Sequence, residues 1–426
     1  MHGVDRRRDP RARGVIQEVA ARPVPLYAAL RFRDFRLLWL GLLISNLGTW
    51  MQFTAMGFFV ARIAASPHQA ALFLGVLGAA RAVPVLLLSP LAGVVADHLP
   101  RRRVLLVTNV TMALCGLMLA VLSTMHLLNL AGLVAISALS SAAMGFDSPT
   151  RQSWVPLLVD RRYVGNAVGL NSVAFNAPAV VGPAIAGGLI VWAGVAGAFY
   201  CNAAATLAVV VAVLYMRPSP PSVTRKEPTL RAMREGIAFI VRHPVLRWIM
   251  LSQLITALLT RPYSQLVAAL AVNLLHAGPR GLGWSVSAIG AGGFGGALVT
   301  AYFAQRERRA ALWLQSGLLM SLSVFALAFV PALAFALPVL FAAGVGTLAS
   351  LGVTNTLIQT LSPDALRGRA LSIYTMIAIG VVPLGSLVDG AIASAIGLRQ
   401  SFALAGAVCA AMFVAIWMFR PIVRTI

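Results

Sequence analysis

Long apolar stretches follow one another along almost the whole chain, separated by short polar loops. A helix needs about 20 apolar residues to cross a bilayer, and lipid tolerates only helices and closed barrels because every backbone polar group must be paired internally. The stretches are too long for barrel strands, so we predict an all-α membrane protein. Its twelve predicted transmembrane helices cover residues 37–61, 71–96, 103–125, 130–150, 165–192, 196–216, 246–272, 282–304, 310–330, 334–358, 370–396 and 400–419.

The basic residues fall on alternate loops. Of the 34 Lys and Arg residues, only Arg62, Arg280 and Arg399 lie in the other set of loops. Arg81 and Arg261 alone lie deep within predicted helices, since Arg103 and Arg247 stand at the helix ends that adjoin the basic loops. By the positive-inside rule, this asymmetry predicts that both termini and the basic loops are cytoplasmic. The net charge of +22 therefore reflects membrane topology, and we expect no nucleic-acid partner.

Composition supports membrane burial. Hydrophobic residues make up 59% of the chain and charged residues 11%, whereas a soluble domain carries about 25% charge. The His, Cys and acidic residues show no spacing typical of a metal site, and no Walker-type phosphate loop occurs. We therefore predict no metal site, no cofactor and no enzymatic activity.

Two halves of the chain resemble each other. The segment 159–167 and the segment 362–370 are alike, and the matching residues lie about 200 positions apart, as do Pro183 and Pro383. This spacing predicts two pseudo-symmetric six-helix bundles with substrate bound between them. The predicted units are a disordered basic N-terminus at 1–26, an N-terminal bundle at 27–216, a cytoplasmic linker at 217–244, a C-terminal bundle at 245–420 and a tail at 421–426.

The second part of the linker has a helical pattern. Between residues 229 and 241, Leu230, Met233, Ile237 and Ile240 recur at helical spacing, with arginines on the other side. Such a pattern predicts an amphipathic helix on the cytoplasmic membrane surface. An ordinary linker that covers apolar surface fits the pattern equally well.

Three charged residues lie well inside predicted helices, away from the helix ends that adjoin the basic loops, where a charge is costly and usually functional. Arg81 and Arg261 fall near the bilayer midplane and must face a cavity or a carboxylate, because arginine stays charged. Asp389 is a candidate for proton uptake, since burial favours a neutral carboxyl group. Exposure near the outer face or pairing with an arginine remain alternatives for Asp389, and a clamp between helices remains an alternative for each arginine.

Uncharged polar residues complete the predicted cavity wall. Each of them is equally compatible with a simple interhelical hydrogen bond. The candidates are Asn46, Gln52, Asn171, Tyr263, Gln265 and Asn355.

The loop after the second predicted helix carries a motif. Its residues 93–103 read Gly-Val-Val-Ala-Asp-His-Leu-Pro-Arg-Arg-Arg. This resembles the Gly-x-x-x-Asp-Arg-x-Gly-Arg-Arg signature of the major facilitator superfamily, with His98 and Pro100 departing from the pattern. The resemblance implies a latch that closes the cytoplasmic side against the eleventh helix near Ala370, formed by Gly93, Asp97, Arg101, Arg102 and Arg151. The spacing of Asp147 and Arg151 also permits a helical ion pair.

Further segments narrow the resemblance. Residues 35–52, 146–152, 166–172 and 367–386 are similar to the transmembrane secretion effector group, which includes enterobactin-exporter-like proteins. The run Gly182-Pro183-Ala-Ile-Ala-Gly187-Gly188 resembles a helix-bending element associated with exporters, with one extra residue before the paired glycines. Helix packing alone would also explain that run.

The resemblance implies a secondary active transporter of a bacterial cytoplasmic membrane. We expect it to export a small amphipathic molecule, such as a drug or siderophore, by alternating access and proton antiport, and we expect a monomer. An inward symporter or facilitator is one alternative. A membrane scaffold, sensor or lipid-handling protein without transport is another.

Overall fold

The structure is a computed structural model that describes residue 25 and residues 27–217, 230–303 and 309–425. These residues form helices and contain no β-strand. Ten of the helices described there are long and apolar enough to cross a membrane. The predicted N-terminal segment 1–26, apart from Pro25, and the first part of the predicted linker lie outside the described residues.

The N-terminal bundle contains five long helices, and the last of them, α6, bends sharply. In α6, Gly194 has φ 67°, a conformation that glycine adopts easily, and two helical arms meet there. The bend separates the predicted spans 165–192 and 196–216. The bundle consists of α2 (Arg33–Ile63), α3 (Pro67–His98), α4 (Arg101–Thr124), α5 (Leu130–Trp154) and α6 (Val164–Tyr215).

Two spans of the C-terminal bundle are interrupted. The seventh predicted span breaks between α8 and α9 and continues as a π-helix at Ala269–Leu274. The eleventh has a π-helix at Met376–Val381 between α13 and α14. The helices are α8 (Leu246–Leu259), α9 (Tyr263–Ala268), α10 (Gly278–Phe303), α11 (Arg309–Leu327), α12 (Leu333–Leu361), α13 (Asp364–Thr375), α14 (Val382–Ile396) and α15 (Leu398–Phe419).

The helices confirm the predicted fold class. Every predicted span coincides with a helix or with a pair of helices that follow one another directly. With the two arms of α6 taken separately and α2 included, the described helices are consistent with twelve crossings.

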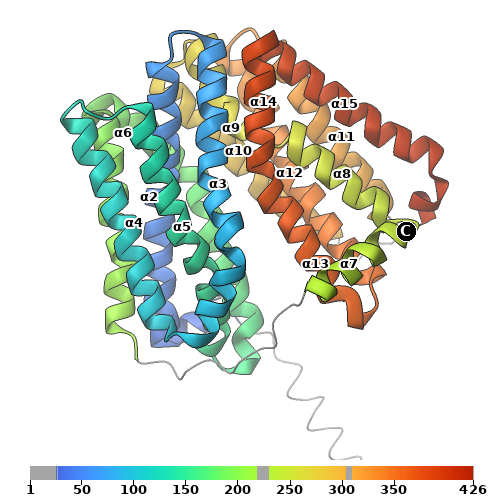
Figure 1. Ribbon diagram of the computed structural model, residues 1–426, viewed down its shortest axis with the longest axis horizontal. Coiled ribbons are helices and arrows are strands. Elements are labelled where there is room, and N and C mark those ends of the chain that lie inside the picture. Colours follow the sequence, from blue (N-terminus) through green and yellow to red (C-terminus); the bar gives the residue numbers. More distant parts are fainter. Residues whose placement is uncertain (1–24, 26, 218–229, 304–308, 426) are drawn as a thin grey trace, which may run out of the picture.

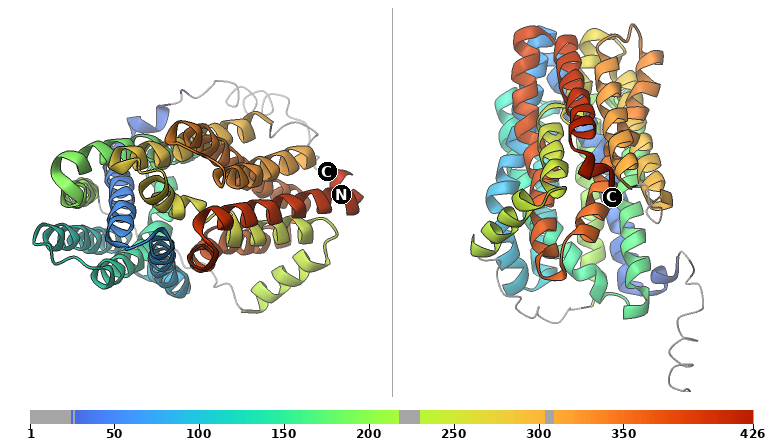
Figure 2. Two further views of the ribbon diagram at one scale, coloured as in Figure 1. Left: turned by 90° about the horizontal axis from the view of Figure 1, so that it is seen from above. Right: turned by 90° about the vertical axis from the view of Figure 1, so that its right-hand side faces the viewer.

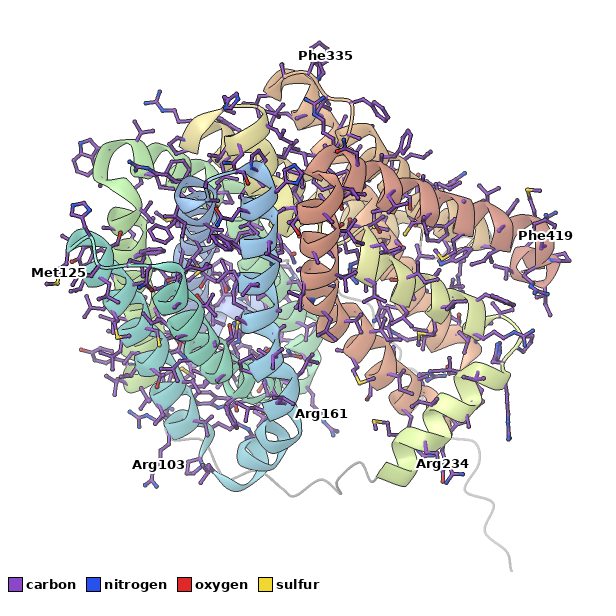
Figure 3. The ribbon with its side chains drawn as sticks, turned by 45° about the horizontal axis from the view of Figure 1, so that its top comes forward. Arg103, Met125, Arg161, Arg234, Phe335 and Phe419 are labelled. Carbon is purple, nitrogen blue, oxygen red and sulfur yellow. The ribbon has the colours of Figure 1, made fainter. Side chains whose placement is uncertain are left out.

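Basic side chains collect at one end of the molecule. Figure 3 shows Arg103, Arg161 and Arg234 at this end and Phe335 at the opposite end. We call the first the basic end and the second the opposite end.

The two bundles pack on each other near the opposite end. The first arm of α6 packs on α10, and α3 packs on α14 (Figures 1 and 2). Glycines permit this approach, because a Cβ atom on Gly290 would lie 2.3 Å from the carbonyl oxygen of Ala179. A Cβ atom on Gly75 would lie 2.6 Å from the carbonyl oxygen of Ser386. At the basic end, α13 lies well apart from the N-terminal bundle in Figure 1.

The helix α7 (Leu230–Arg242) occupies the second part of the linker. Ile240 is buried in a cluster with Ala370 and Ile373 of α13, and Arg369 forms an ion pair with Glu235. Met233, Ile237 and Val241 remain exposed on the other side. The helix therefore covers apolar surface of the C-terminal bundle and still presents an apolar stripe to its surroundings. Its position on the cytoplasmic membrane surface stays a prediction.

Candidate functional site

Two cavities share Arg81 as a wall. The first lies between the bundles and is lined from α2 and α3 on one side and from α9 and α10 on the other. The second lies within the N-terminal bundle among α2, α3, α4, α5 and α6. Arg81 lies in the middle of the predicted second span, so a charged group separates the two cavities deep in the apolar region.

The Arg81 guanidinium has an aromatic neighbour but no counter-charge among the described residues. Its Cζ atom lies 5.3 Å from the centre of the Phe53 ring, a distance at which a cation is attracted to the ring face. Within the described part of the chain, no carboxylate pairs with Arg81 and no residue that lines either cavity is acidic. The positive charge at this position is therefore uncompensated.

Gln52 lines the second cavity, as predicted for a cavity residue. Its side-chain oxygen accepts a hydrogen bond from Nδ2 of Asn202 in the second arm of α6. The Oδ1 atom of Asn202 is buried and has no donor among the described residues. Hydroxyl and thioether side chains surround this pair, namely Ser45, Thr49, Met56, Met112, Ser137, Ser140, Ser141, Met144 and Thr206.

Arg261 and Tyr263 lie at the break between α8 and α9. The Arg261 side chain is close to the phenols of Tyr263 and Tyr374, and its Nη1 atom is buried without a hydrogen-bond partner among the described residues. Neither Arg261 nor Tyr263 lines either of the two cavities described above. Gln265, one turn further along, does line the cavity between the bundles.

Asp389 faces the interior of the C-terminal bundle. It is 1% exposed, its Oδ1 accepts a hydrogen bond from the Ser401 hydroxyl of α15, and its Oδ2 has no partner among the described residues. It therefore lines neither cavity and forms no ion pair with an arginine in the described structure. Both alternatives considered for it from the sequence, exposure and an arginine partner, are wrong for this structure.

The three remaining candidate residues lie outside the two cavities. Asn46 donates a hydrogen bond to the carbonyl oxygen of Ala174 at 3.0 Å and so joins α2 to α6. Asn355 accepts a hydrogen bond from Gln359 within α12. Asn171 is partly buried in the first arm of α6. Asn46 and Asn355 therefore have structural hydrogen bonds in this conformation.

The predicted latch does not bridge the bundles through its described members. Arg101 donates to the Ser153 hydroxyl, and Arg102 donates to the carbonyl oxygen of Leu214. Arg151 pairs with Asp147 at 3.6 Å in the helical ion pair that its spacing allowed. All these contacts stay within the N-terminal bundle. The side chain of Asp97 and the surroundings of Gly93 lie outside the described residues.

The helix-bending element packs against two helices. A Cβ atom on Gly182 would lie 2.9 Å from Trp50 of α2, and one on Gly187 would lie 2.7 Å from the carbonyl oxygen of Pro279 at α10. The carbonyl oxygen of Pro183 would lie 2.5 Å from a Cβ atom on Gly283. Gly188 has open space around it. The element therefore contributes three of its four residues to close packing, and two of these three are at the contact between the bundles.

Several cavity residues were missed from the sequence. Asn202 and Thr206 lie in a predicted span that carried no charge, and the serines of α5 resemble ordinary helix-packing residues. One signal was available, because Ser137, Ser141 and Met144 recur on one face of α5 and Ser45, Thr49 and Gln52 on one face of α2. Polar residues on one face of each of two helices in the same bundle indicate that these faces line a common polar cavity.

Comparison with known proteins identifies the relatives of this chain. Residues 25–426 match the family model described as transmembrane secretion effector. The multidrug efflux pump Tap of Mycolicibacterium fortuitum is 26% identical, with 78% of this chain and 83% of that protein covered. The uncharacterized MFS-type transporter YfiS of Bacillus subtilis is 26% identical, with 85% of this chain and 87% of that protein covered.

Solved structures of transporters share the fold. The D-xylose-proton symporter superimposes with a TM-score of 0.72 and 16% identity, covering 93% of this chain and 99% of that one. A point mutant of the nucleoside transporter NupG gives a TM-score of 0.73 and 14% identity, covering 90% of this chain and 100% of that one. At these identities the likeness establishes the fold and no more.

Proposed function

The chain belongs to the transmembrane secretion effector family of MFS-type membrane transporters, and on that basis we propose that it exports small amphipathic molecules by alternating access. Family membership makes it a multi-pass membrane transporter of small molecules rather than an enzyme. The Tap pump is similar to this chain over most of the length of both proteins, and its name is multidrug efflux pump. This similarity supports export over import.

The packing of the bundles carries the proposal. They meet through α6 with α10 and α3 with α14 at the opposite end, while the described latch arginines at the basic end bond within their own bundle. If the basic end is cytoplasmic, as the positive-inside rule predicts, this is the inward-facing state. Rocking the bundles about the Arg81 cavities would release substrate on the other side.

We assign proton coupling to Asp389. A buried carboxyl group without a counter-charge favours its neutral form, because an isolated charge in an apolar interior is costly. The next residue, Gly390, touches Gly75 of α3 at the contact between the bundles. Proton release from Asp389 would therefore disturb the helix that closes the opposite end, which links protonation to the conformational change.

Everted membrane vesicles test direction and coupling together. A substrate first found by a resistance screen in a strain without its own pumps should accumulate inside such vesicles when a proton gradient is present, and an uncoupler should abolish the accumulation. Accumulation in right-side-out vesicles instead would support the inward symporter. No movement of any screened compound would support the scaffold or sensor.

Asp389→Asn tests the coupling residue. We expect the variant to lose gradient-driven accumulation while it keeps substrate exchange without a gradient, because the amide cannot take up or release a proton. Asp364→Asn is the control, since Asp364 pairs with Arg367 on the exposed surface of α13. If Asp389→Asn accumulates substrate as well as the wild type does, Asp389 is not the coupling residue.

A further inference from the structure

We propose that Arg81 and the second cavity form a binding site for the anionic group of an amphipathic organic anion, and that such anions are the preferred substrates. The proposal rests on the proposed transport function and adds the chemical class of the cargo. All the described residues that line this cavity belong to the N-terminal bundle, so no residue of the C-terminal bundle is needed to form it.

The uncompensated charge of Arg81 is the first observation. A guanidinium keeps its charge, and burying it without an anion is expensive. The Phe53 ring offsets part of this cost, but a ring face offers no acceptor for the N–H groups of the guanidinium. Since the described residues provide no carboxylate there, a bound oxyanion would supply both the counter-charge and the hydrogen-bond acceptors.

The cavity wall is the second observation. Ser45, Ser140 and Ser141 carry hydroxyl groups that can donate to an oxyanion, and none of the described lining residues is acidic. The hydroxyls of Thr49 and Ser137, which also line the cavity, donate here to the carbonyl oxygen of Ser45 and to the Met56 sulfur. A cation would find no counter-charge among the described lining residues. The wall therefore discriminates by sign, since it favours negative groups and opposes positive ones.

The apolar part of the wall indicates the rest of the ligand. Phe53, Met56, Met112 and Met144 line the same cavity, and thioethers adapt to ligands of different shape. Phe53, Met56 and Arg81 also line the cavity between the bundles. A molecule with an aromatic or aliphatic body could lie between the bundles and extend its negative group past Arg81 into the second cavity.

Binding of matched dyes to the purified protein in nanodiscs tests the proposal. The fluorescent 1-pyrenebutyric acid carries a free carboxylate and no positive charge, and its methyl ester has the same body without that group. This pair heads a panel of amphipathic carboxylates and their methyl esters. We expect the wild type to bind the acids more tightly than the esters. Equal binding across the panel, or tighter binding of the esters, overturns the proposal without any variant.

Substitutions at Arg81 locate the preference. Charge-assisted hydrogen bonds contribute strongly, so Arg81→Gln should lower the acid-to-ester affinity ratio by about tenfold or more. Arg81→Lys keeps a positive charge and should therefore keep part of the preference for acids over esters. This second variant keeps the test valid if Arg81→Gln fails to fold. Arg261→Gln should leave the ratio unchanged because Arg261 lines neither cavity. An unchanged ratio in Arg81→Gln, or a ratio lost in Arg261→Gln, contradicts the assignment.

Free chloride is the competing source of negative charge. Chloride could neutralise Arg81 while an uncharged substrate binds beside it. In that case, a higher chloride concentration would strengthen the binding of the esters, and this result would also overturn the proposal. We expect chloride only to compete weakly with the acids. These binding measurements need no proton gradient, so they can succeed even if export in vesicles fails. The proposal of an anion site and the proposal of export can therefore fail separately.

Discussion

Gly290→Ala is expected to slow transport by about tenfold or more, because an added methyl group pushes apart the two bundles where they meet. Its Cβ atom would lie 2.3 Å from the carbonyl oxygen of Ala179, a backbone atom that cannot rotate away. Overpacking of this kind costs about 1–3 kcal/mol, and each 1.4 kcal/mol changes a rate or population by a factor of about ten. The transport cycle passes through this closed contact, so its loss should slow every turnover.

The matched control lies on the same helix. In Gly295→Ala the nearest atom to the new Cβ would be Cγ2 of Val345 at 3.8 Å, an ordinary contact. A second pair repeats the comparison on α6, where Gly187 touches α10 and Gly188 faces open space. We expect Gly187→Ala to be slow and Gly188→Ala to be normal in initial rates of vesicle uptake at matched protein amounts. Wild-type rates in both Gly290→Ala and Gly187→Ala would show that the contact is not part of the cycle.

Gly292→Val is expected to prevent folding or to lower the melting temperature strongly. A Cβ atom at this position would lie 2.0 Å from the carbonyl oxygen of Phe341, where α10 packs on α12. Both helices belong to the C-terminal bundle, so this contact persists in every state if the bundle moves as a rigid body. Without room for the side chain the helices must separate, which costs about 3 kcal/mol or more, at or above the upper end of ordinary overpacking.

Thermal unfolding followed by size-exclusion chromatography measures the effect. The two glycines lie only two positions apart on α10, so the comparison separates two kinds of contact. Gly290→Ala should change the rate of transport with little change in melting temperature, whereas Gly292→Val should reduce the yield of folded protein. A Gly292→Val protein as stable as the wild type would mean that the bundle is not packed as described.

The fold was largely predictable from the sequence because lipid imposes a strong length rule. Each predicted span met a helix, since only a helix pairs its own backbone groups in hydrocarbon. The breaks in the seventh and eleventh spans were not predicted. The first break falls in the polar run Thr-Arg-Pro-Tyr-Ser-Gln at 260–265, which was included in a predicted span. The π-helix at Met376–Val381 lies in an apolar run, where hydropathy does not distinguish it from a continuous α-helix.

The site was only partly predictable, because helix rotation decides which face meets a cavity. Arg81 was found since a charge in a span must face something polar. Asp389 was found by the same reasoning, but its rotation directs it toward Ser401 and away from the cavities. Asn202 and the serines of α5 carry no charge, and a hydroxyl in a helix can bond to its own backbone, so nothing in their identity distinguishes a cavity wall from packing.

Distances between spin labels at both ends of the molecule test the central claim most directly. In a variant without Cys115, Cys201 and Cys409, cysteines would carry one label pair at Asp160 and Asp364 near the basic end. A second pair at Met125 and Phe335 would report on the opposite end. Met125 caps the end of α4 that is away from Arg103, and Figure 3 shows Phe335 at the opposite end. On addition of transported substrate, rocking predicts that one distance falls while the other rises. Two distances that stay fixed, or that change in the same direction, would contradict alternating access by two rigid bundles.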